Sequence, residues 1–206
     1  MRWEEFLERV KGLPLIELNS FIQEEPLLRV QASRWLAHGK IIKVKSGVYL
    51  LAERYRKIEL YEPYLASVLK RPSYISLEKA LEYHNLIPEA VTVFTSVTTK
   101  RQASFVSEAG RFEYRHLKPT LFFGYKPVTV RGQTGFVAEP EKALLDFLYL
   151  KAPRFSREFI EELRLQNTAS LDLKKLFEYA QRFRKKDILN YVNLIAAEIK
   201  IEKRRR

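Results

Sequence analysis

The sequence predicts an α+β protein: an N-terminal winged helix-turn-helix, then a mixed domain that contains an antiparallel sheet and ends in helices. Short amphipathic helical patterns occupy the start of the chain and lead into a lysine-rich hairpin. Runs rich in β-branched and aromatic residues, separated by glycine, lysine and proline, fill the middle, and three helical patterns close the chain.

The first domain is expected over residues 1–56 and begins with "WEEFLERVKG", whose apolar residues recur at helical spacing until Gly12. "IELNSFIQ" predicts a second short helix that ends before Pro26, and "LLRVQASRWLAHGK" predicts a third that ends near Gly39. A hairpin follows, with "KIIKVK" and "VYLL" joined by a Ser-Gly turn. Three helices and a hairpin predict a winged helix-turn-helix, with the third helix as recognition helix and the hairpin as wing.

The third helix has two faces on a helical wheel. Its apolar positions, Leu28, Ala32, Trp35 and Leu36, fall within one arc and are expected to face the core. The opposite arc holds Val30, Ser33, Arg34 and Ala37 and is expected to face solvent.

The second domain is expected over residues 57–206. It begins with an amphipathic helix around residues 57–70, and "YISLEKALEYHNLI" predicts another helix capped by Ser76. The sheet is expected from "TVFTSVTT", "ASFV", "GRFEYRHL", "TLFFGY", "VTVRG" and "GFVAE". Helices then follow in "PEKALLDFLYLK", which has Pro140 at its first position, and in "SREFIEELRL", "DLKKLFEYAQRF" and "KDILNYVNLIAAEIKI". No flexible Gly/Ser linker occurs, so we expect the two domains to pack together.

The composition favours a folded protein with a polyanionic partner. Of the 206 residues, 46% are apolar, and 37 basic against 25 acidic residues give a net charge of +12, which favours nucleic acid. The absence of cysteine excludes disulfides and zinc–cysteine sites and fits a reducing compartment. No apolar run reaches the roughly 18 residues of a membrane span, and "MRWEEFLERV" lacks a signal-peptide core. We therefore expect a cytoplasmic protein with no membrane partner.

One stretch of the chain carries only positive charge. The acidic residues stop at Glu25 and resume at Glu53, and the cations between them are Arg29, Arg34, Lys40, Lys43 and Lys45. This stretch coincides with the recognition helix and wing, the two elements that a winged helix presses against DNA. We expect it to bind DNA, although some winged helices use the same surface to hold a protein.

The expected roles of these residues differ. Arg34 is expected to make a bidentate contact with guanine in the major groove, with Arg29, Gln31 and Ser33 near base edges or phosphate. The hairpin lysines Lys40, Lys43 and Lys45 are expected to bind the phosphate backbone, where they govern affinity more than sequence choice.

A second basic face is expected between residues 99 and 135, as a site for an acidic partner. Its cations include Lys100, Arg101, Arg111, Arg115 and Lys118.

The sequence shows no catalytic or metal-binding pattern, so we expect neither enzymatic activity nor a cofactor. The three histidines lie far apart, no Gly-rich phosphate loop occurs, and no serine sits in a nucleophile elbow. "EPEKALLD" invites comparison with metal-dependent nucleases through Glu139, Glu141, Lys142 and Asp146, but the spacing is not that of such sites. Helix capping and surface ion pairing are the preferred interpretation.

Several long stretches resemble the AbiEi-type antitoxins of type IV toxin-antitoxin (abortive infection) systems. They are "GKIIKVKSGVYLL", "YISLEKALEYHNLIPEAVTVFTSVTTKR", "GRFEYRHLKPTLFFGY" and "AEPEKALLDFLYL", and the likeness spans roughly residues 27–184. The resemblance implies a transcriptional autorepressor whose winged helix binds inverted repeats in duplex DNA at its own promoter. It also implies a second domain needed to counter a nucleotidyltransferase-like toxin, generally without a stable complex.

The family's DNA contacts carry over to Arg29, Arg34, Lys40, Lys43 and Lys45. Tyr74, Ile75, Leu77, Ala80 and Leu81, in one of the resembling blocks, have the composition of core. Three alternatives stay open: a solitary regulator without a toxin, a DNA-targeted nuclease, and an interaction protein that uses the second basic face.

Overall fold

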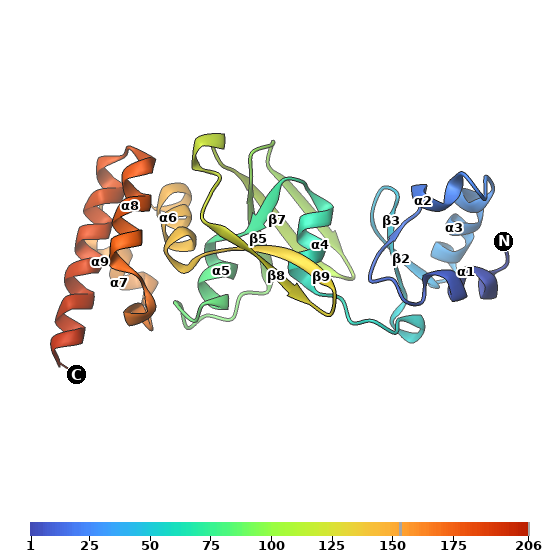
Figure 1. The fold of residues 1–206 in the computed structure, drawn as a ribbon, viewed down its shortest axis with the longest axis horizontal. Helices are drawn as coiled ribbons and strands as arrows, with labels where there is room; N and C mark the ends of the chain where they lie inside the picture. Colours follow the sequence, from blue (N-terminus) through green and yellow to red (C-terminus); the bar gives the residue numbers. More distant parts are fainter. Residues whose placement is uncertain (153, 206) are drawn as a thin grey trace.

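The computed structural model of the chain describes residues 1–152 and 154–205, with side chains described up to residue 200. The molecule is elongated, and its two termini lie at opposite ends (Figure 1). An N-terminal module of helices and a small sheet occupies one end, a larger mixed sheet the middle, and a layer of helices the other end.

The N-terminal module, residues 1–51, alternates helices with three short strands. Its elements are α1 (Trp3–Val10), β1 (Ile16–Glu17), α2 (Asn19–Ile22), α3 (Leu28–Ala37), β2 (Ile41–Lys45) and β3 (Val48–Leu51). The strands are antiparallel in the order β1-β3-β2. The predicted second helix is shorter than expected, because Ile16 and Glu17 form β1 and pair with Tyr49 and Val48 of the hairpin.

Aromatic residues at helical spacing hold α1 against α3. Phe6 stacks on Trp35 with ring centroids 4.5 Å apart, and Trp3 meets Trp35 edge-on at 5.2 Å. Leu28 and Ala32 complete the buried face of α3 as predicted. Leu36 is 37% exposed, contrary to expectation, because it lies at the edge of the apolar arc in the last turn of the helix.

The rest of the chain is built around a six-stranded sheet. After the 3₁₀ turn η1 (Glu53–Tyr55) come α4 (Glu62–Leu69), β4 (Ser73–Ile75), α5 (Leu77–Tyr83), β5 (Val93–Thr98), β6 (Ala103–Ser107), β7 (Gly110–His116), η2 (Pro119–Leu121), β8 (Tyr125–Val130) and β9 (Gln133–Ala138). The helices α6 (Pro140–Lys151), α7 (Arg157–Leu163), η3 (Thr168–Ser170), α8 (Leu173–Phe183) and α9 (Lys186–Arg205) follow.

The sheet is mixed, whereas the sequence analysis expected it to be antiparallel. Its order is β6-β7-β5-β4-β9-β8, and the pairs β5/β7 and β4/β9 are parallel. Strand patterns locate strands but carry little information on their direction. Here the chain continues from β5 to the edge strand β6 and then returns as β7, which lies between β6 and β5 and pairs with both.

Two segments differ from their predicted local structure. "TLFFGY", expected as a strand, contains the end of η2, and β8 starts only at Tyr125. Residues 73–75, for which the sequence analysis predicted no strand, form the short central strand β4, which is buried along its whole length. Ser76 occupies the N-cap position of α5, but its hydroxyl caps no backbone N–H.

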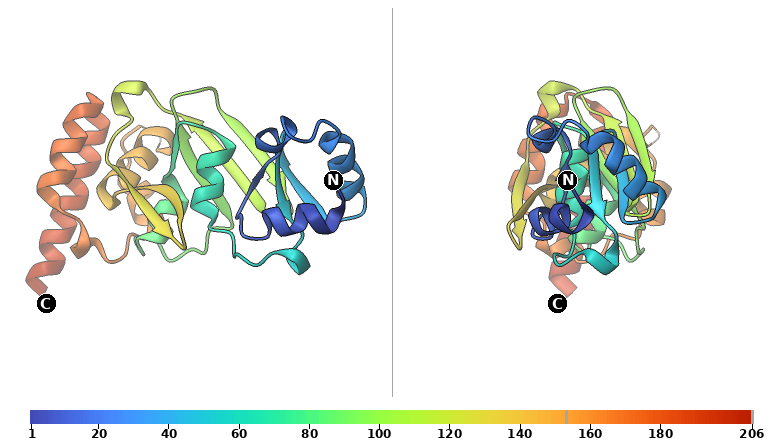
Figure 2. Two further views of the ribbon diagram at one scale, coloured as in Figure 1. Left: turned by 45° about the vertical axis from the view of Figure 1, so that its right-hand side comes forward. Right: turned by 90° about the vertical axis from the view of Figure 1, so that its right-hand side faces the viewer.

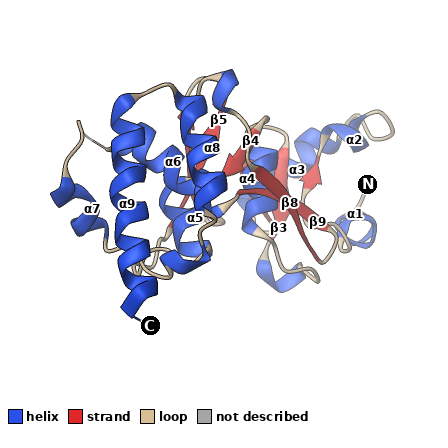
Figure 3. Ribbon diagram, turned by 60° about the vertical axis from the view of Figure 1, so that its left-hand side comes forward, coloured by secondary structure: helices blue, strands red, loops and turns tan. Residues whose placement is uncertain are grey.

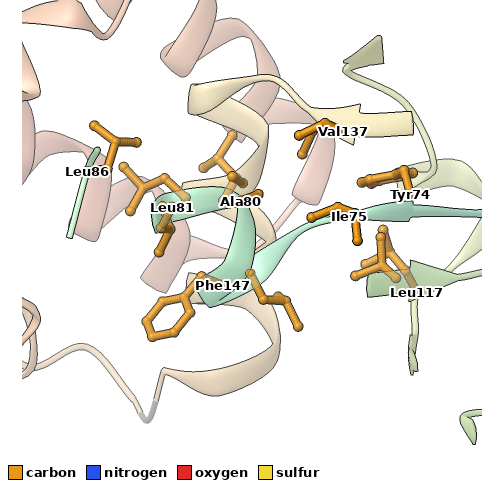
Figure 4. Packing of buried hydrophobic residues seen from close by; sticks show 14 of the residues in the cluster. Tyr74, Ile75, Ala80, Leu81, Leu86, Leu117, Val137 and Phe147 are labelled. Atoms are coloured by element: carbon orange, nitrogen blue, oxygen red, sulfur yellow. The ribbon is translucent and has the colours of Figure 1, made fainter. Parts of the chain in front are cut away.

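The main core lies between this sheet and the helices of the C-terminal half. Tyr74 and Ile75 of β4 project from the sheet in the same region as Val137 of β9, and Leu81 and Leu86 lie towards the helical layer (Figure 4). The residues predicted to be core are all buried, which confirms the predicted core composition of the block around β4 and α5: Tyr74, Ile75, Leu77, Ala80 and Leu81. The three predicted C-terminal helices are present as α7, α8 and α9, packed side by side beyond α6 (Figure 3).

The N-terminal module packs against this larger body through the second face of its own sheet. Val44, Val48 and Leu50 of the hairpin belong to the main core, whereas Ile41 and Leu51 face the module's helices. Strand β2 lies beside the edge strand β6, and Figure 2 shows the module against the end of the larger sheet. The three-stranded sheet is therefore buried on both faces.

Gly135 of β9 marks the tightest packing between the large sheet and α4. A Cβ atom built there would lie 2.6 Å from the carbonyl carbon of Pro63, so no larger residue fits without moving α4. We expect Gly135→Ala to lower the free energy of unfolding by about 1–3 kcal/mol in chemical denaturation. Gly12→Ala is the matched control, because nothing lies within 4 Å of its Cβ position. Equal stability of the two variants would contradict this packing.

Candidate nucleic-acid interface

Helix α3 presents a polar, cationic face to solvent. Leu28, Ala32 and Trp35 are buried, so the helical period turns Arg29, Ser33 and Arg34 outward, and all three are exposed. The Ser33 hydroxyl donates to the Arg29 carbonyl oxygen at 3.1 Å. Neither arginine forms an ion pair with any described residue, so both guanidinium groups retain their donors for an external ligand.

The exposed face of α3 also contains an apolar element that charge-based reasoning overlooked. Val30 is 54% exposed and Leu27, just before the helix, is 69% exposed. An apolar side chain between two arginines matches the mixed surface of base edges in the major groove, where thymine presents its methyl group. The helical wheel already predicted that Val30 is exposed, because it places Val30 on the same arc as Ser33 and Arg34.

Gln31 does not lie on this face. It is half-buried, and its Oε1 atom is shielded from solvent with no hydrogen-bond partner in the described part of the chain. The expectation that Gln31 lies near base edges is therefore not met. Its position on the wheel is next to the buried arc, and the polarity of glutamine alone does not reveal on which side of the helix it lies.

The three hairpin lysines, expected to act together, occupy different environments. Lys43 is exposed, on a strand residue paired with Tyr49. Lys40 is half-buried, with its Nζ 4.8 Å from the centre of the Trp3 ring in a cation–π contact. Lys43 is thus fully available to an anion, and Lys40 in part.

Lys45 is turned towards the larger body instead of towards solvent. Its Nζ donates to the carbonyl oxygens of Val68 at 2.6 Å and Leu69 at 3.3 Å, at the C-terminal end of α4. A cation is favourable at that end of a helix because the unpaired carbonyls carry partial negative charge. Burial lowers the pKa of Lys45. Lys45 is an interdomain contact, which corrects its predicted role at the DNA backbone.

A β-bulge explains why the side chains of Lys43 and Lys45 point in different directions. Lys43 pairs with Tyr49 and Lys45 with Val48, so one extra residue, Val44, is inserted in β2. Two-residue alternation would place both lysines on one face, but the bulge interrupts it and directs Val44 and Lys45 towards the larger body. The sequence "KVK" contains no feature that distinguishes a bulged strand from a regular one.

The predicted second basic face is divided among separate surfaces. Arg111 and Arg115 project from the same side of β7 and share Glu113, at 2.6 and 3.8 Å, so they are partly neutralised. Lys100 lines a hollow of about 400 Å³ beside the hairpin turn. Lys118 lines a different hollow, next to α8, and Arg101 is exposed in the loop before β6. These cations therefore occupy different local environments.

The "EPEKALLD" block is buried, so its interpretation as surface ion pairing is wrong. Lys142 and Asp146 form an ion pair one turn apart on α6, and both side chains are 0% exposed. Asp146 also accepts hydrogen bonds from the Tyr74 hydroxyl at 2.9 Å and the Ser76 hydroxyl at 2.8 Å. Burial raises the pKa of Asp146 and lowers that of Lys142, while their mutual attraction opposes both shifts.

Glu139, just before α6, receives several donors from neighbouring elements. The Tyr179 hydroxyl donates to it at 2.7 Å, and the amines of Lys126 and Lys175 lie 2.8 and 3.3 Å away. Burial raises the pKa of its carboxyl, but these hydrogen bonds outweigh burial and lower the pKa to about 2. Glu139 occupies the N-cap position of α6, as expected, but its side chain caps no backbone N–H.

The Glu141 carboxylate of this block connects two helices. One Glu141 oxygen accepts the Asp172 N–H at 2.8 Å, which ties α6 to the start of α8. No group of three or more histidine, aspartate and glutamate residues that could hold a metal ion occurs among the side chains described in residues 1–152 and 154–200. The block acts as a polar connection between sheet and helices.

The buried Lys142–Asp146 pair gives a stability prediction. We expect Asp146→Ala to lower the free energy of unfolding by about 3–5 kcal/mol, because it leaves a buried ammonium without its counter-charge. The double variant Lys142→Met/Asp146→Leu should be more stable than Asp146→Ala, because it removes both charges. Urea unfolding followed by circular dichroism measures both. An Asp146→Ala variant as stable as the parent would contradict the pair.

The lowered pKa of Glu139 gives a pH prediction. Its carboxylate stabilises the fold fully above its ordinary pKa of 4.5, and this contribution is lost as the pH falls towards about 2. We expect the free energy of unfolding of the parent to decline over that window more steeply than that of Glu139→Gln. Glu4→Gln, at an exposed position of α1, is the matched control and should follow the parent. Parallel pH profiles for Glu139→Gln and the parent would refute this assignment.

Comparisons with known proteins add no family to this geometry. The chain matches no protein-family model, and no curated protein is significantly similar to it. In the part of the chain that the structure describes, no helix has both the length and the apolar character needed to cross a bilayer.

Proposed function

We propose that the chain is a DNA-binding transcriptional autorepressor and the antitoxin of a type IV toxin-antitoxin system. The observation that carries the DNA-binding part is the exposed face of α3. Two arginines without ion pairs to described residues flank a serine and a valine there, in a stretch of chain without a single carboxylate. Such a helix supplies bidentate donors for guanine, a hydroxyl for phosphate and an apolar contact for thymine.

The order of elements supports a winged helix-turn-helix assignment for the N-terminal module. A helix, a short strand, two helices and a hairpin follow one another, and the first strand joins the hairpin in an antiparallel sheet. In that fold α3 is the recognition helix. The hairpin would act as the wing through Lys43, with Lys40 near the base of the strand, because Lys45 is engaged by the larger body.

The larger body would hold the module while leaving α3 free. The module's sheet is covered on one side by its helices and on the other by the sheet domain, whereas the basic face of α3 is exposed. An operator with inverted repeats would be bound by two copies of the chain, one per half-site.

The antitoxin part of the proposal derives from the resemblance of the wing and of three blocks in the larger body to AbiEi-type antitoxins. A nucleotidyltransferase-like toxin would be the functional partner. A growth assay in which this chain is co-expressed with a nucleotidyltransferase encoded beside it tests this part. The chain should restore growth whether or not the two proteins purify together.

Binding to the chain's own upstream DNA tests the repressor part. In a mobility-shift titration, Arg34→Ala should weaken binding by about 1–3 kcal/mol, mainly at one base position. Lys43→Glu should weaken binding to all sequences and flatten the dependence on salt, because it removes a phosphate contact.

Lys174→Ala and Lys174→Glu are the matched controls, since Lys174 is an exposed cation on α8 at the far end of the molecule. Both should bind the operator like the parent. If Arg34→Ala and Lys43→Glu also bind like the parent, the proposed interface is wrong.

A further inference from the structure

A basic hollow lies at the end of the molecule opposite to α3. Its volume is about 550 Å³. Its walls come from the segment that enters η2, from the end of α6 and from the turn between α8 and α9. That turn lies at the upper edge of the helical layer in Figure 1.

Four cations line this hollow: Lys118, Arg182, Arg184 and Lys185. All four are exposed, and none of their side chains forms a hydrogen bond or ion pair with a described residue. No described residue that lines the hollow is acidic. Four like charges gathered in one concave place repel one another, and a bound anion would offset that repulsion.

The local structure holds part of this charge in place. The guanidinium carbon of Arg182 lies 3.4 Å from the centre of the Phe123 ring, and Lys185 Nζ lies 4.3 Å from the centre of the Tyr149 ring. Arg184 has φ of 52°, a left-handed conformation that ends α8 and that arginine rarely adopts. The turn brings Arg184 and Lys185 to the start of α9, where the helix dipole adds partial positive charge.

The shape of the hollow favours a small ligand over a duplex. Its volume lies within the roughly 300–1,000 Å³ of small-molecule sites, and the cations converge on it from two segments, the start of η2 and the end of α8 with the turn that follows. It lies at the other end of the molecule from α3, so it does not continue the proposed operator-binding face. Thr120 and Tyr149 add hydroxyl groups, and the Tyr149 ring with Leu121 adds an apolar wall.

We propose that this hollow binds a small molecule that carries two or more phosphate groups, such as a nucleoside triphosphate. Arginine binds phosphate oxygens in a bidentate manner and lysine adds point charges, so four cations suit a chain of phosphates better than a single one. The apolar wall would contact the non-phosphate part of the ligand. This binding is independent of the DNA-binding proposal.

Isothermal titration calorimetry of the full chain tests the proposal with ATP, inorganic tripolyphosphate and AMP as probes. We expect ATP and tripolyphosphate to bind, AMP to bind much more weakly, and salt to weaken all binding. The triple variant Lys118→Gln/Arg184→Asn/Lys185→Gln should lose affinity for both polyphosphates by at least about tenfold. Asparagine is chosen at position 184 because it tolerates the left-handed conformation.

The matched control removes three exposed cations elsewhere, as Arg101→Gln/Lys174→Gln/Lys200→Gln, and should bind the probes like the parent. Equal thermal unfolding midpoints for both triple variants and the parent establish that the hollow variant is folded. Absence of polyphosphate binding by the parent, or equal loss in both triple variants, overturns the proposal. The polyphosphate proposal is also overturned if the hollow variant binds polyphosphates like the parent and is impaired only in duplex DNA binding. Failure of the operator assay alone contradicts the DNA-binding proposal and leaves the polyphosphate proposal standing.

Discussion

The docking of the β2–β3 hairpin on the larger body is the constraint on which the presentation of α3 depends. Val44, Val48 and Leu50 remove the second face of the small sheet from water, and Lys45 closes the contact by binding the carbonyl end of α4. Burial of the apolar side chains supplies most of the free energy of this contact, and the hydrogen bonds of Lys45 fix the orientation of the hairpin relative to α4. With one face of the sheet docked and the other covered by α1 and α3, the side of α3 opposite its buried arc is left to solvent.

A second polar contact organises the larger body. Lys142 and Asp146 occupy the inner side of α6, and Asp146 collects hydroxyl donors from Tyr74 and Ser76 at the end of the central strand β4. Buried charges at this density are often associated with catalysis, but here the donors and acceptors are matched with one another. The cluster therefore fixes the position of α6 relative to the sheet.

Exposed cations gather in one place at each end of the long axis. At the α3 end the cations spread over one helix and one strand, a distribution suited to an extended duplex. At the α8–α9 end they converge on a hollow, a distribution suited to a compact anion. Elsewhere, Arg111 and Arg115 share Glu113, and Lys126 and Lys175 are bound by Glu139. The net charge of the sequence alone does not distinguish cations that are free to bind an external anion from cations that are neutralised within the protein.

The sequence by itself determined what depends on neighbours along the chain. Helical spacing located α1, α3 and α6, Pro140 marked the start of α6, and the Ser-Gly turn marked the hairpin, because each signal acts within a few residues. Only the tertiary structure decided strand direction in the large sheet, the partial burial of Gln31 and the partners of Lys45 and Lys142. The position of Lys45 depends on a one-residue bulge, and the burial of Gln31 and Lys142 depends on elements distant in sequence. The free energy of a charged side chain depends on the groups that surround it in space, which the sequence does not list side by side.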